Sequence, residues 1–268
     1  MSTLAACIHS LGLLGPGLTD WSSSHAVLSG ELPHVAARTV LPPPGVLPPA
    51  ERRRAGRVIK LALAVGAEAL AHARSHSTLD ATALPTIFTS SGGDGDNCHE
   101  ICLSLASQER LISPTRFHNS VHNAAAGYWG IAYGCTEAST SLCAGDASFG
   151  AGLLEALAQL ACGAPAVLLL AYDADYPPPL HAKRPIADAF GVALLLTPPV
   201  TGSALPRLQL SMSDAPAAIM GDAGLESLRA SIPAARALPL LERLAQRRSG
   251  SVVLDYLDAA RLAVEVRT

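Results

Sequence analysis

The chain has 268 residues and a formal net charge of −3, and this weak acidity gives no reason to expect nucleic acid or an anionic membrane as a partner. Hydrophobic residues make up 49% of the composition and charged residues 15%, so the chain can bury a substantial core but has few charged side chains for its surface, which favours an oligomer. Its apolar runs fall short of the roughly 20 residues that a membrane span needs. We expect a cytoplasmic protein without a membrane span.

The first 50 residues are predicted to form a strand, a short helix and an extended connector. Residues 4–14 have the composition of a strand that ends at the glycine-rich turn of residues 15–17. Asp20 is placed to cap a helix over residues 21–28. Residues 41–50 are rich in proline, which removes backbone donors and disfavours helix in its neighbours, so this segment is predicted to be an extended surface connector.

Residues 51–72 have the apolar spacing of one long helix, and three consecutive arginines lie at its start. Arg52, Arg53 and Arg54 form either a solvated basic face or a contact for an anionic partner. The next strand is predicted over residues 84–89. A polar, glycine-rich loop follows it and leads into another helix.

That second helix is predicted over residues 97–105 and places Cys98 and Cys102 one turn apart. Because no further Cys/His pair nearby completes a tetrahedral set, we interpret the pair as packed thiols and expect neither a metal nor a cofactor. The six cysteines form no compact framework, which predicts reduced and mostly buried thiols. His118 and His122 have the spacing of a helical pair, but the Glu of a zinc-protease motif is absent between them.

The stretch from Ala138 to Cys162 changes character partway. Its Ser/Thr-rich beginning suits a short strand, whereas the Ala/Leu-rich part after Asp146 has helical spacing and ends before Gly163. Residues 142–145 are therefore predicted to form a strand-to-helix elbow. Such an elbow exposes one side chain at the mouth of an α/β sheet, with a helix N-terminus below it.

The second half of the chain is predicted to complete one layered α/β unit. Residues 166–172 form a continuous apolar run, as expected of a parallel strand that is covered on both faces, and residues 188–196 form another strand. The order of strands and helices favours a βαβ-type arrangement. Residues 200–268 are predicted to contain a short extended piece, two helices and a closing hairpin.

The elbow sequence, Ser139-Thr140-Ser141-Leu142-Cys143-Ala144-Gly145 with Gly150 beyond it, resembles the active-site elbow of the β-ketoacyl synthases. The pattern of these condensing enzymes reads Ser-Thr-Ala-Cys-Ala-Thr-Gly. Matching the Ser-Thr pair and the glycines puts Leu142 at the nucleophile position, and Cys143 comes one residue late. Residues 117–131 are similar to the "Pro-Asn…Ala-Gly" segment that precedes the nucleophile strand in the same family.

This resemblance implies an α/β, thiolase-like N-terminal half with a mostly parallel mixed sheet covered by helices on both faces, lacking the full C-terminal half. We expect a single domain over residues 1–268, with a core of about 1–200 and a short C-terminal extension over 201–268. Condensation in this family uses a thiolate nucleophile and two C-terminal histidines (or His and Asn). All nine histidines of this chain lie at or before His181.

The resemblance therefore implies a shortened chain-length-factor subunit of the aryl polyene type. Such a subunit is a non-catalytic partner that shapes the acyl tunnel of a β-ketoacyl synthase in fatty acid or polyketide biosynthesis. The implied partners are a ketosynthase subunit, in a heterodimer, and an acyl carrier protein with a phosphopantetheine-linked acyl chain. Two alternatives remain: a condensing acyltransferase with Cys143 as nucleophile, and a stand-alone module that binds acyl chains or carrier proteins.

The same resemblance assigns roles to individual side chains, each with plain core packing or a solvated surface as the alternative. The arginines at positions 52–54 are expected to contact the carrier protein or its phosphate. The expected tunnel or interface residues are Phe117, His118, His122, Tyr128, Trp129, Leu142 and Phe149.

Overall fold

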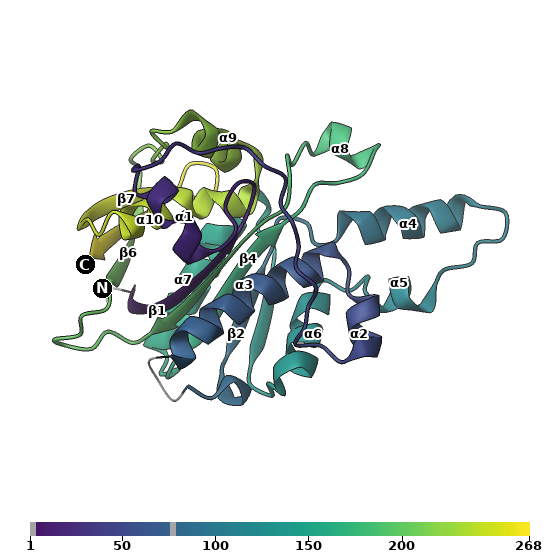
Figure 1. Cartoon of the computed structure of the whole chain (residues 1–268), viewed down its shortest axis with the longest axis horizontal. Coiled ribbons are helices and arrows are strands. Elements are labelled where there is room, and N and C mark those ends of the chain that lie inside the picture. The colour runs from purple at the N-terminus through teal and green to yellow at the C-terminus, as the bar shows by residue number, and fades with distance from the viewer. Residues whose placement is uncertain (1–3, 76–78) are drawn as a thin grey trace.

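The computed structural model describes residues 4–75 and 79–268, which form one sheet of eight strands in the order β3-β2-β4-β5-β1-β6-β8-β7 (Figure 1). The strands are β1 (Leu4–Leu14), β2 (Thr86–Thr89), β3 (Ser139–Leu142), β4 (Val167–Asp173), β5 (Phe190–Thr197), β6 (Arg207–Ser213), β7 (Gly250–Asp255) and β8 (Arg261–Arg267). The α-helices are α1 (Trp21–Leu28), α2 (Pro49–Arg54), α3 (Arg57–Arg74), α4 (Gly95–Ala106), α5 (Pro114–His118), α6 (Ala124–Tyr133), α7 (Ser148–Ala161), α8 (Leu180–Lys183), α9 (Ala223–Ser231) and α10 (Leu238–Ala245). The 3₁₀ segments are η1 (Ala81–Ala83), η2 (Gly145–Ala147) and η3 (Pro233–Ala237).

The sheet has two parts that differ in strand direction. Strands β3 and β4 run parallel to β2, and we call these three strands the parallel half. Strands β5, β1, β6, β8 and β7 form the antiparallel half, and β5 also pairs antiparallel with β4. The sheet is therefore mostly antiparallel, and the predicted mostly parallel sheet is wrong. Strand β5 is buried almost throughout, which is the pattern of a parallel strand, yet it returns beside β4 in the opposite direction.

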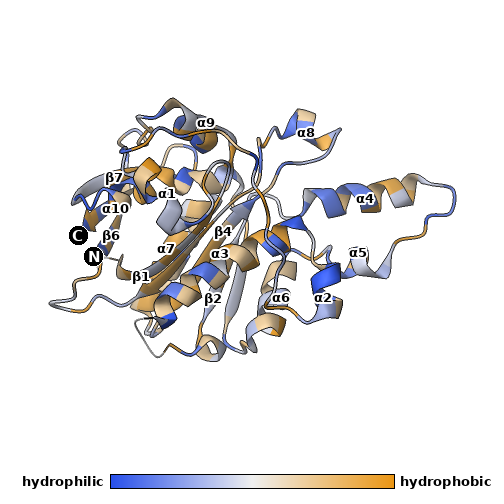
Figure 2. Ribbon diagram, in the orientation of Figure 1, coloured by the Kyte–Doolittle hydropathy of each residue, from blue (hydrophilic) through white to orange (hydrophobic). Residues whose placement is uncertain are grey.

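Helices cover both faces of the sheet, as predicted. Helices α3 and α6 pack on one face, and α7, η3 and α10 pack on the other (Figure 1). The strands between them are hydrophobic along much of their length (Figure 2). Contact between β1 and α3 is so close that a Cβ on Gly12 would lie 2.0 Å from the carbonyl oxygen of Val65, so only glycine fits at this position.

The long helix predicted over residues 51–72 is two helices, α2 and α3, separated by extended residues Ala55 and Gly56. A side chain at position 56 would be crowded, because a Cβ on Gly56 would lie 2.7 Å from a carboxylate oxygen of Asp94, the residue that caps α4. Pro49 at the start of α2 also shortens the predicted extended connector by two residues, because proline is well tolerated in the first turn of a helix.

Helices α4 and α5 project from the body of the molecule, on the side away from the C-terminal end of the chain (Figure 1). We call residues 95–118 the arm. The elements of the second half lie close to their predicted positions, including the antiparallel β7–β8 hairpin at the C-terminal end. Within residues 4–75 and 79–268, no helix is both long enough and apolar enough to cross a membrane.

Candidate functional site

Three polar residues meet where the strands of the parallel half end. Because β3, β2 and β4 run in the same direction, their carboxyl ends lie at one edge of the sheet, where ligand sites of α/β proteins usually form. Cys143 follows β3, Ser91 follows β2, and Asp173 is the last residue of β4. The Cys143 thiol donates to the carbonyl of Ser91 at 3.0 Å, and Ser91 in turn bonds to Asp173.

Asp173 is buried and is held by three donors. Its Oδ1 accepts from the backbone N–H and the hydroxyl of Ser91, at 2.8 and 2.6 Å, and its Oδ2 accepts from the N–H of Ala234 at 2.9 Å. Burial disfavours the carboxylate and raises the pKa of Asp173 to about 6, although these hydrogen bonds oppose the shift. Asp173 thus links the loop after β2 to η3, which packs on the same face of the sheet as α7.

The predicted elbow is present between β3 and α7. Gly145 has a φ of +55°, a left-handed conformation that glycine adopts without strain. The hydroxyl of Ser148 accepts from the N–H of Ala144 at 3.0 Å and donates to the carbonyl of Gly145 at 2.7 Å, which closes the turn before the helix. The hydroxyl of Thr89 donates to the Ser148 carbonyl at 2.8 Å, so the elbow is attached to β2.

The elbow directs two adjacent side chains to different environments. Leu142 is half-buried and packs against the core that contains Phe149, whereas the side chain of Cys143 is exposed. The Cys143 thiol gives its proton to a carbonyl, an interaction that the thiolate cannot make. Among the described residues, no hydrogen bond or ion pair joins Cys143 to a histidine, so the elbow lacks the nucleophile–base contact of a cysteine-dependent acyltransferase.

A cavity of about 370 Å³ lies beside this edge, between the loop after β2, helix α4 and the segment before α6. Its walls combine apolar side chains with a few polar groups, which is typical of sites for small or elongated ligands. His122 lines it, but His118 does not. The two histidines are not a helical pair, because α5 ends at His118 and His122 lies in the turn before α6.

Cys98 and Cys102 also line this cavity, and both are exposed. The prediction that the cysteines are mostly buried is wrong: Cys143 and Cys162 are exposed as well, and Cys7 is buried. An apolar neighbour in the sequence does not bury a cysteine: Leu160 is in the core, whereas Cys162, just past the end of α7, is exposed. Within the described residues, no group of three or more His, Cys, Asp or Glu side chains is arranged to hold a metal ion.

The aromatic residues predicted near the interface divide into core and surface. Tyr128 and Trp129 are buried, at 1% exposure each, and pack on the face covered by α3 and α6. The hydroxyl of Tyr128 donates to Oδ1 of Asn119 at 3.1 Å, which ties α6 to the end of the arm. Phe117 is 69% exposed. Of the predicted aromatic set, only Phe117 is available to a partner, while His118 packs its ring edge-on to Tyr128.

The three arginines of α2 have different environments. Nη2 of Arg52 donates to the carbonyls of Gly45 and Leu47, at 3.2 and 3.0 Å, and so anchors the proline-rich connector. Arg53 and Arg54 are exposed, and Arg54 forms an ion pair with Glu51 at 3.0 Å. The structure therefore leaves two of the three side chains at the surface.

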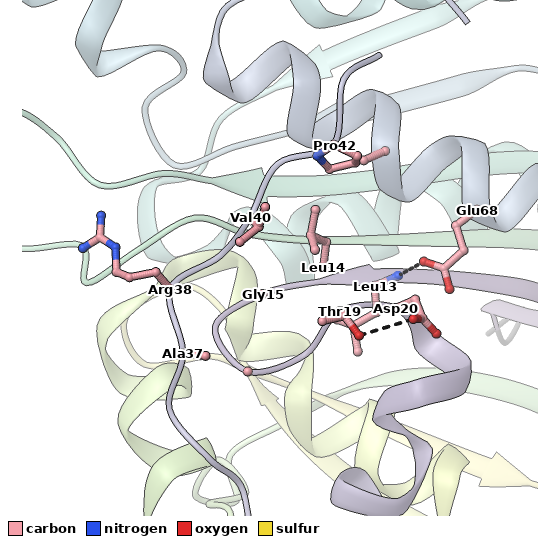
Figure 3. A pocket seen from close by; sticks show the side chains of 12 residues that line it. Leu13, Leu14, Gly15, Thr19, Asp20, Ala37, Arg38, Val40, Pro42 and Glu68 are labelled. Atoms are coloured by element: carbon pink, nitrogen blue, oxygen red, sulfur yellow. Dashed lines mark hydrogen bonds between the residues drawn. The ribbon is translucent and has the colours of Figure 1, made fainter. Parts of the chain in front are cut away.

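A second cavity, of about 310 Å³, lies between β1, helix α3 and the connector (Figure 3). Half-buried Glu68 lines it and accepts from the N–H of Leu13 at 2.8 Å and from the N–H of Trp21, the first residue of α1, at 2.7 Å. Burial raises the pKa of Glu68. Because both oxygens already bind backbone donors, Glu68 serves to hold α1 against α3.

Sequence reasoning found the elbow but missed the residues that surround it. One signal in the sequence could have found three of them. Each is a polar residue at the end of a predicted strand or at the start of a predicted helix: Ser91, Asp173 and Ser148. Arg184 and Arg236, which form ion pairs with Asp146 of the elbow, gave none. They lie 38 and 90 residues from Asp146 in the chain, and only the fold brings them together.

Comparison with known proteins places this architecture in a family. A model described as the β-ketoacyl synthase N-terminal domain matches residues 21–253. No curated protein sequence matches the chain.

Three solved structures share the fold along nearly their whole length, at low sequence identity. One is a chain from the complex of the ketosynthase ApeO with its chain length factor ApeC, from Xenorhabdus doucetiae, with a TM-score of 0.73 and 24% identity over 98% of this chain and 99% of that one. The ishigamide ketosynthase/chain length factor gives a TM-score of 0.71 and 14% identity, over 98% and 99% of the two chains. The third, AntDE:AntF, is described as a type II polyketide synthase acyl-carrier protein in complex with its ketosynthase bound to the hexaketide; it gives a TM-score of 0.75 and 11% identity, over 100% of both chains. The family model spans most of the sequence and the three likenesses span the fold, and so the chain belongs to the β-ketoacyl synthase N-terminal domain family and has its thiolase-like mixed α/β fold.

Proposed function

We propose that the chain is a non-catalytic, chain-length-factor-like partner of a β-ketoacyl synthase in an aryl polyene-type fatty acid or polyketide pathway. One observation supports the proposal: Leu142, which the resemblance of the elbow matches to the family's nucleophile, is half-buried and packs against the core. The neighbouring Cys143 donates its proton to the Ser91 carbonyl and forms no hydrogen bond with a histidine among the described residues. A chain of this family with leucine at the matched position suits a subunit that acts through a partner.

The surface of the arm supports a partner of this kind. An apolar stripe at helical spacing runs along α4 and consists of Cys98, Ile101, Cys102 and Leu105. Strand β3, at the edge of the sheet, adds backbone groups that a neighbouring strand can pair with. Exposed apolar surface on this scale is typical of an interaction site. The large hydrophobic side chains exposed on the arm are Leu103, Leu105, Leu111 and Phe117, and Val121 and Ile131 are exposed in the segment that follows it.

The cavity beside the arm supports a role in acyl-chain accommodation. Ile101 and the two cysteines of α4 form one wall, and Val58 and Ile59 of α3 form part of another. An alkyl or polyene chain gains its affinity from contact with such apolar walls. In the proposed heterodimer this cavity extends the partner's acyl tunnel, and exposed Arg53 and Arg54 are available to contact the anionic carrier protein or its phosphopantetheine phosphate.

The first experiment is co-expression with a ketosynthase encoded beside this gene, followed by mass determination of the purified species and a condensation assay on acylated carrier protein. We expect a 1:1 heterodimer, and we expect Cys143→Ala to condense as well as wild type. Cys162→Ala, which removes an exposed thiol at the end of α7, is the matched control. Loss of condensation in Cys143→Ala alone would instead identify Cys143 as a catalytic nucleophile. Binding of acylated carrier protein by this chain without any ketosynthase would favour a stand-alone binding module.

The tunnel is tested by filling the cavity. Ile101→Trp adds a large side chain to the cavity wall, and we expect the heterodimer to release products shorter by at least one extension unit. Leu103→Trp adds the same group to the exposed side of α4, outside the cavity lining, and is expected to leave product length unchanged. Equal product lengths from both variants would show that this cavity does not receive the acyl chain.

A further inference from the structure

Behind the elbow, two arginines from distant segments converge on one carboxylate. Asp146 lies in η2, Arg184 directly follows α8, and Arg236 lies in η3. Arg184 pairs with Oδ1 of Asp146, and Nη2 of Arg236 pairs with Oδ2 at 3.1 Å. These three side chains line a cavity of about 320 Å³, which we call the arginine cavity.

In the arginine cavity, two arginines share one carboxylate, whereas Arg229 pairs with two acids. Arg229 offers the comparison, because it binds both oxygens of Glu226, at 2.6 and 2.7 Å, and also Asp255 at 2.7 Å. Two guanidinium groups share the single carboxylate of Asp146, and each uses one of its five N–H donors in a described hydrogen bond. Most of the donors of both arginines therefore have no described partner.

The other acid within electrostatic reach of Arg184 does not occupy these donors. Asp173 attracts Arg184 at longer range, but its oxygens accept from Ser91 and Ala234. Lys183, exposed beside Arg184, adds further positive charge to this region. The local field at the cavity mouth thus comes mainly from cationic side chains whose donors are free to bind.

The walls of the arginine cavity strengthen any bond made inside it. Pro185, Ile186 and Pro233 form apolar walls, and the side chains of Arg184 and Arg236 are 36% and 22% exposed. A partly desolvated guanidinium binds an oxyanion more tightly than one in water, and its planar fork matches two oxygens of a phosphate at once.

We propose that the arginine cavity binds a phosphate-class oxyanion, which bridges the Arg184 and Arg236 guanidiniums in competition with the carboxylate of Asp146. This inference stands on its own geometry and does not rest on the proposed function. Two ligands could supply this oxyanion: free phosphate, and the phosphate ester at the end of a pantetheine arm. No bond is made or broken in the binding step.

The competition with Asp146 makes the proposal testable on the purified chain. Thermal unfolding and calorimetric titration with inorganic phosphate, at ionic strength held constant with chloride, would compare wild type with Asp146→Asn. Removal of the competing carboxylate is expected to tighten phosphate binding at least five-fold, and bound phosphate should raise the Tm of the variant. The control is Asp255→Asn, which removes the acid between Arg229 and Arg261 at a place where none of the described cavities opens. An equal phosphate response in the two variants would overturn the proposal.

The arginines and the source of the phosphate are tested in further arms. Arg236→Gln is expected to abolish phosphate binding, and Arg184→Gln, in a more exposed loop, gives the same test if the first variant fails to fold. Tighter binding of phosphopantetheine than of inorganic phosphate would identify the pantetheine arm as the source, and equal binding would identify free phosphate. If pantetheine without its phosphate binds as well as phosphopantetheine, the cavity does not recognise phosphate and the proposal is wrong.

Discussion

The two halves of the sheet differ in where they hold polar groups. In the antiparallel half, the buried strand positions are apolar with the exception of Ser10 in the described part of the chain. In the parallel half and its loops, polar side chains are buried together at the carboxyl ends of the strands: Thr89, Ser90, Ser91 and Asp173. Apolar burial stabilises a fold, whereas buried polar groups stabilise it only when fully paired. The antiparallel half thus contributes mainly to the free energy of unfolding, and the parallel half carries the candidate functional site.

The largest expected effect tests this division of roles. Leu194→Ala in β5 removes a fully buried side chain from the antiparallel half, and we expect a loss of about 3 kcal/mol in the free energy of unfolding because a cavity remains. Leu142→Ala in the parallel half removes a half-buried side chain and should cost about 1 kcal/mol. Urea unfolding measures both. Equal losses would show that stability is shared evenly between the halves.

The next effect is a dependence of stability on pH that originates at Asp173. Its pKa in the folded chain, about 6, lies above the ordinary value of 3.8, so the folded state holds a proton that the unfolded state has already released. Stability from this group is therefore complete below about pH 4 and is lost as the pH rises through about 6. The expected loss is roughly 3 kcal/mol, at about 1.4 kcal/mol per unit of pKa difference.

Asp173→Asn is the variant that isolates this contribution. It removes the titration, so the decline in stability between pH 4 and pH 7 should shrink. The variant should also be less stable than wild type at pH 4.5, because an amide NH₂ would replace the oxygen that accepts from Ala234. Urea unfolding across this pH range measures both effects. An unchanged pH slope in Asp173→Asn would assign the decline to other groups.

The smallest effect concerns the arm. Asp94→Ala removes the carboxylate that accepts from the N–H of Asn97 at 2.9 Å and caps α4; loss of such a cap costs about 1 kcal/mol. Asp222→Ala removes the equivalent cap of α9, whose accepted bond from Leu225 is also 2.9 Å. Hydrogen exchange should show faster opening confined to residues 95–106 in the first variant, because the arm packs little against the body. Global loss of stability in both variants would show that the arm unfolds with the core.

Most of the elements could be predicted from the sequence, but the way they pair could not. Periodicity located β1, α1, the elbow and the closing hairpin to within a few residues, because each has a local pattern and a local boundary. Strand direction has no local signature. Strand β5 is buried on both faces between layers of helix, so its apolar run resembles that of a parallel strand although it pairs antiparallel with β4 and β1.

Only the part of the candidate site that consists of consecutive residues could be predicted from the sequence. Leu142 and Cys143 belong to a motif of consecutive residues, and the structure places them at the elbow as expected. Asp173 and Ser91 lie 82 residues apart and meet because β2 and β4 are neighbours, which composition does not reveal. Tyr128 and Trp129 illustrate the opposite error. They were expected at the tunnel or interface because they lie near a motif, but both are buried in the core.

The edge strand β3 has a consequence for the tendency of the free chain to aggregate. It is only four residues long, and its sequence, Ser-Thr-Ser-Leu, is mostly polar. Short, polar edge strands are poor templates for the uncontrolled sheet growth that leads to aggregates. An open β3 edge therefore gives the free chain little tendency towards uncontrolled sheet growth.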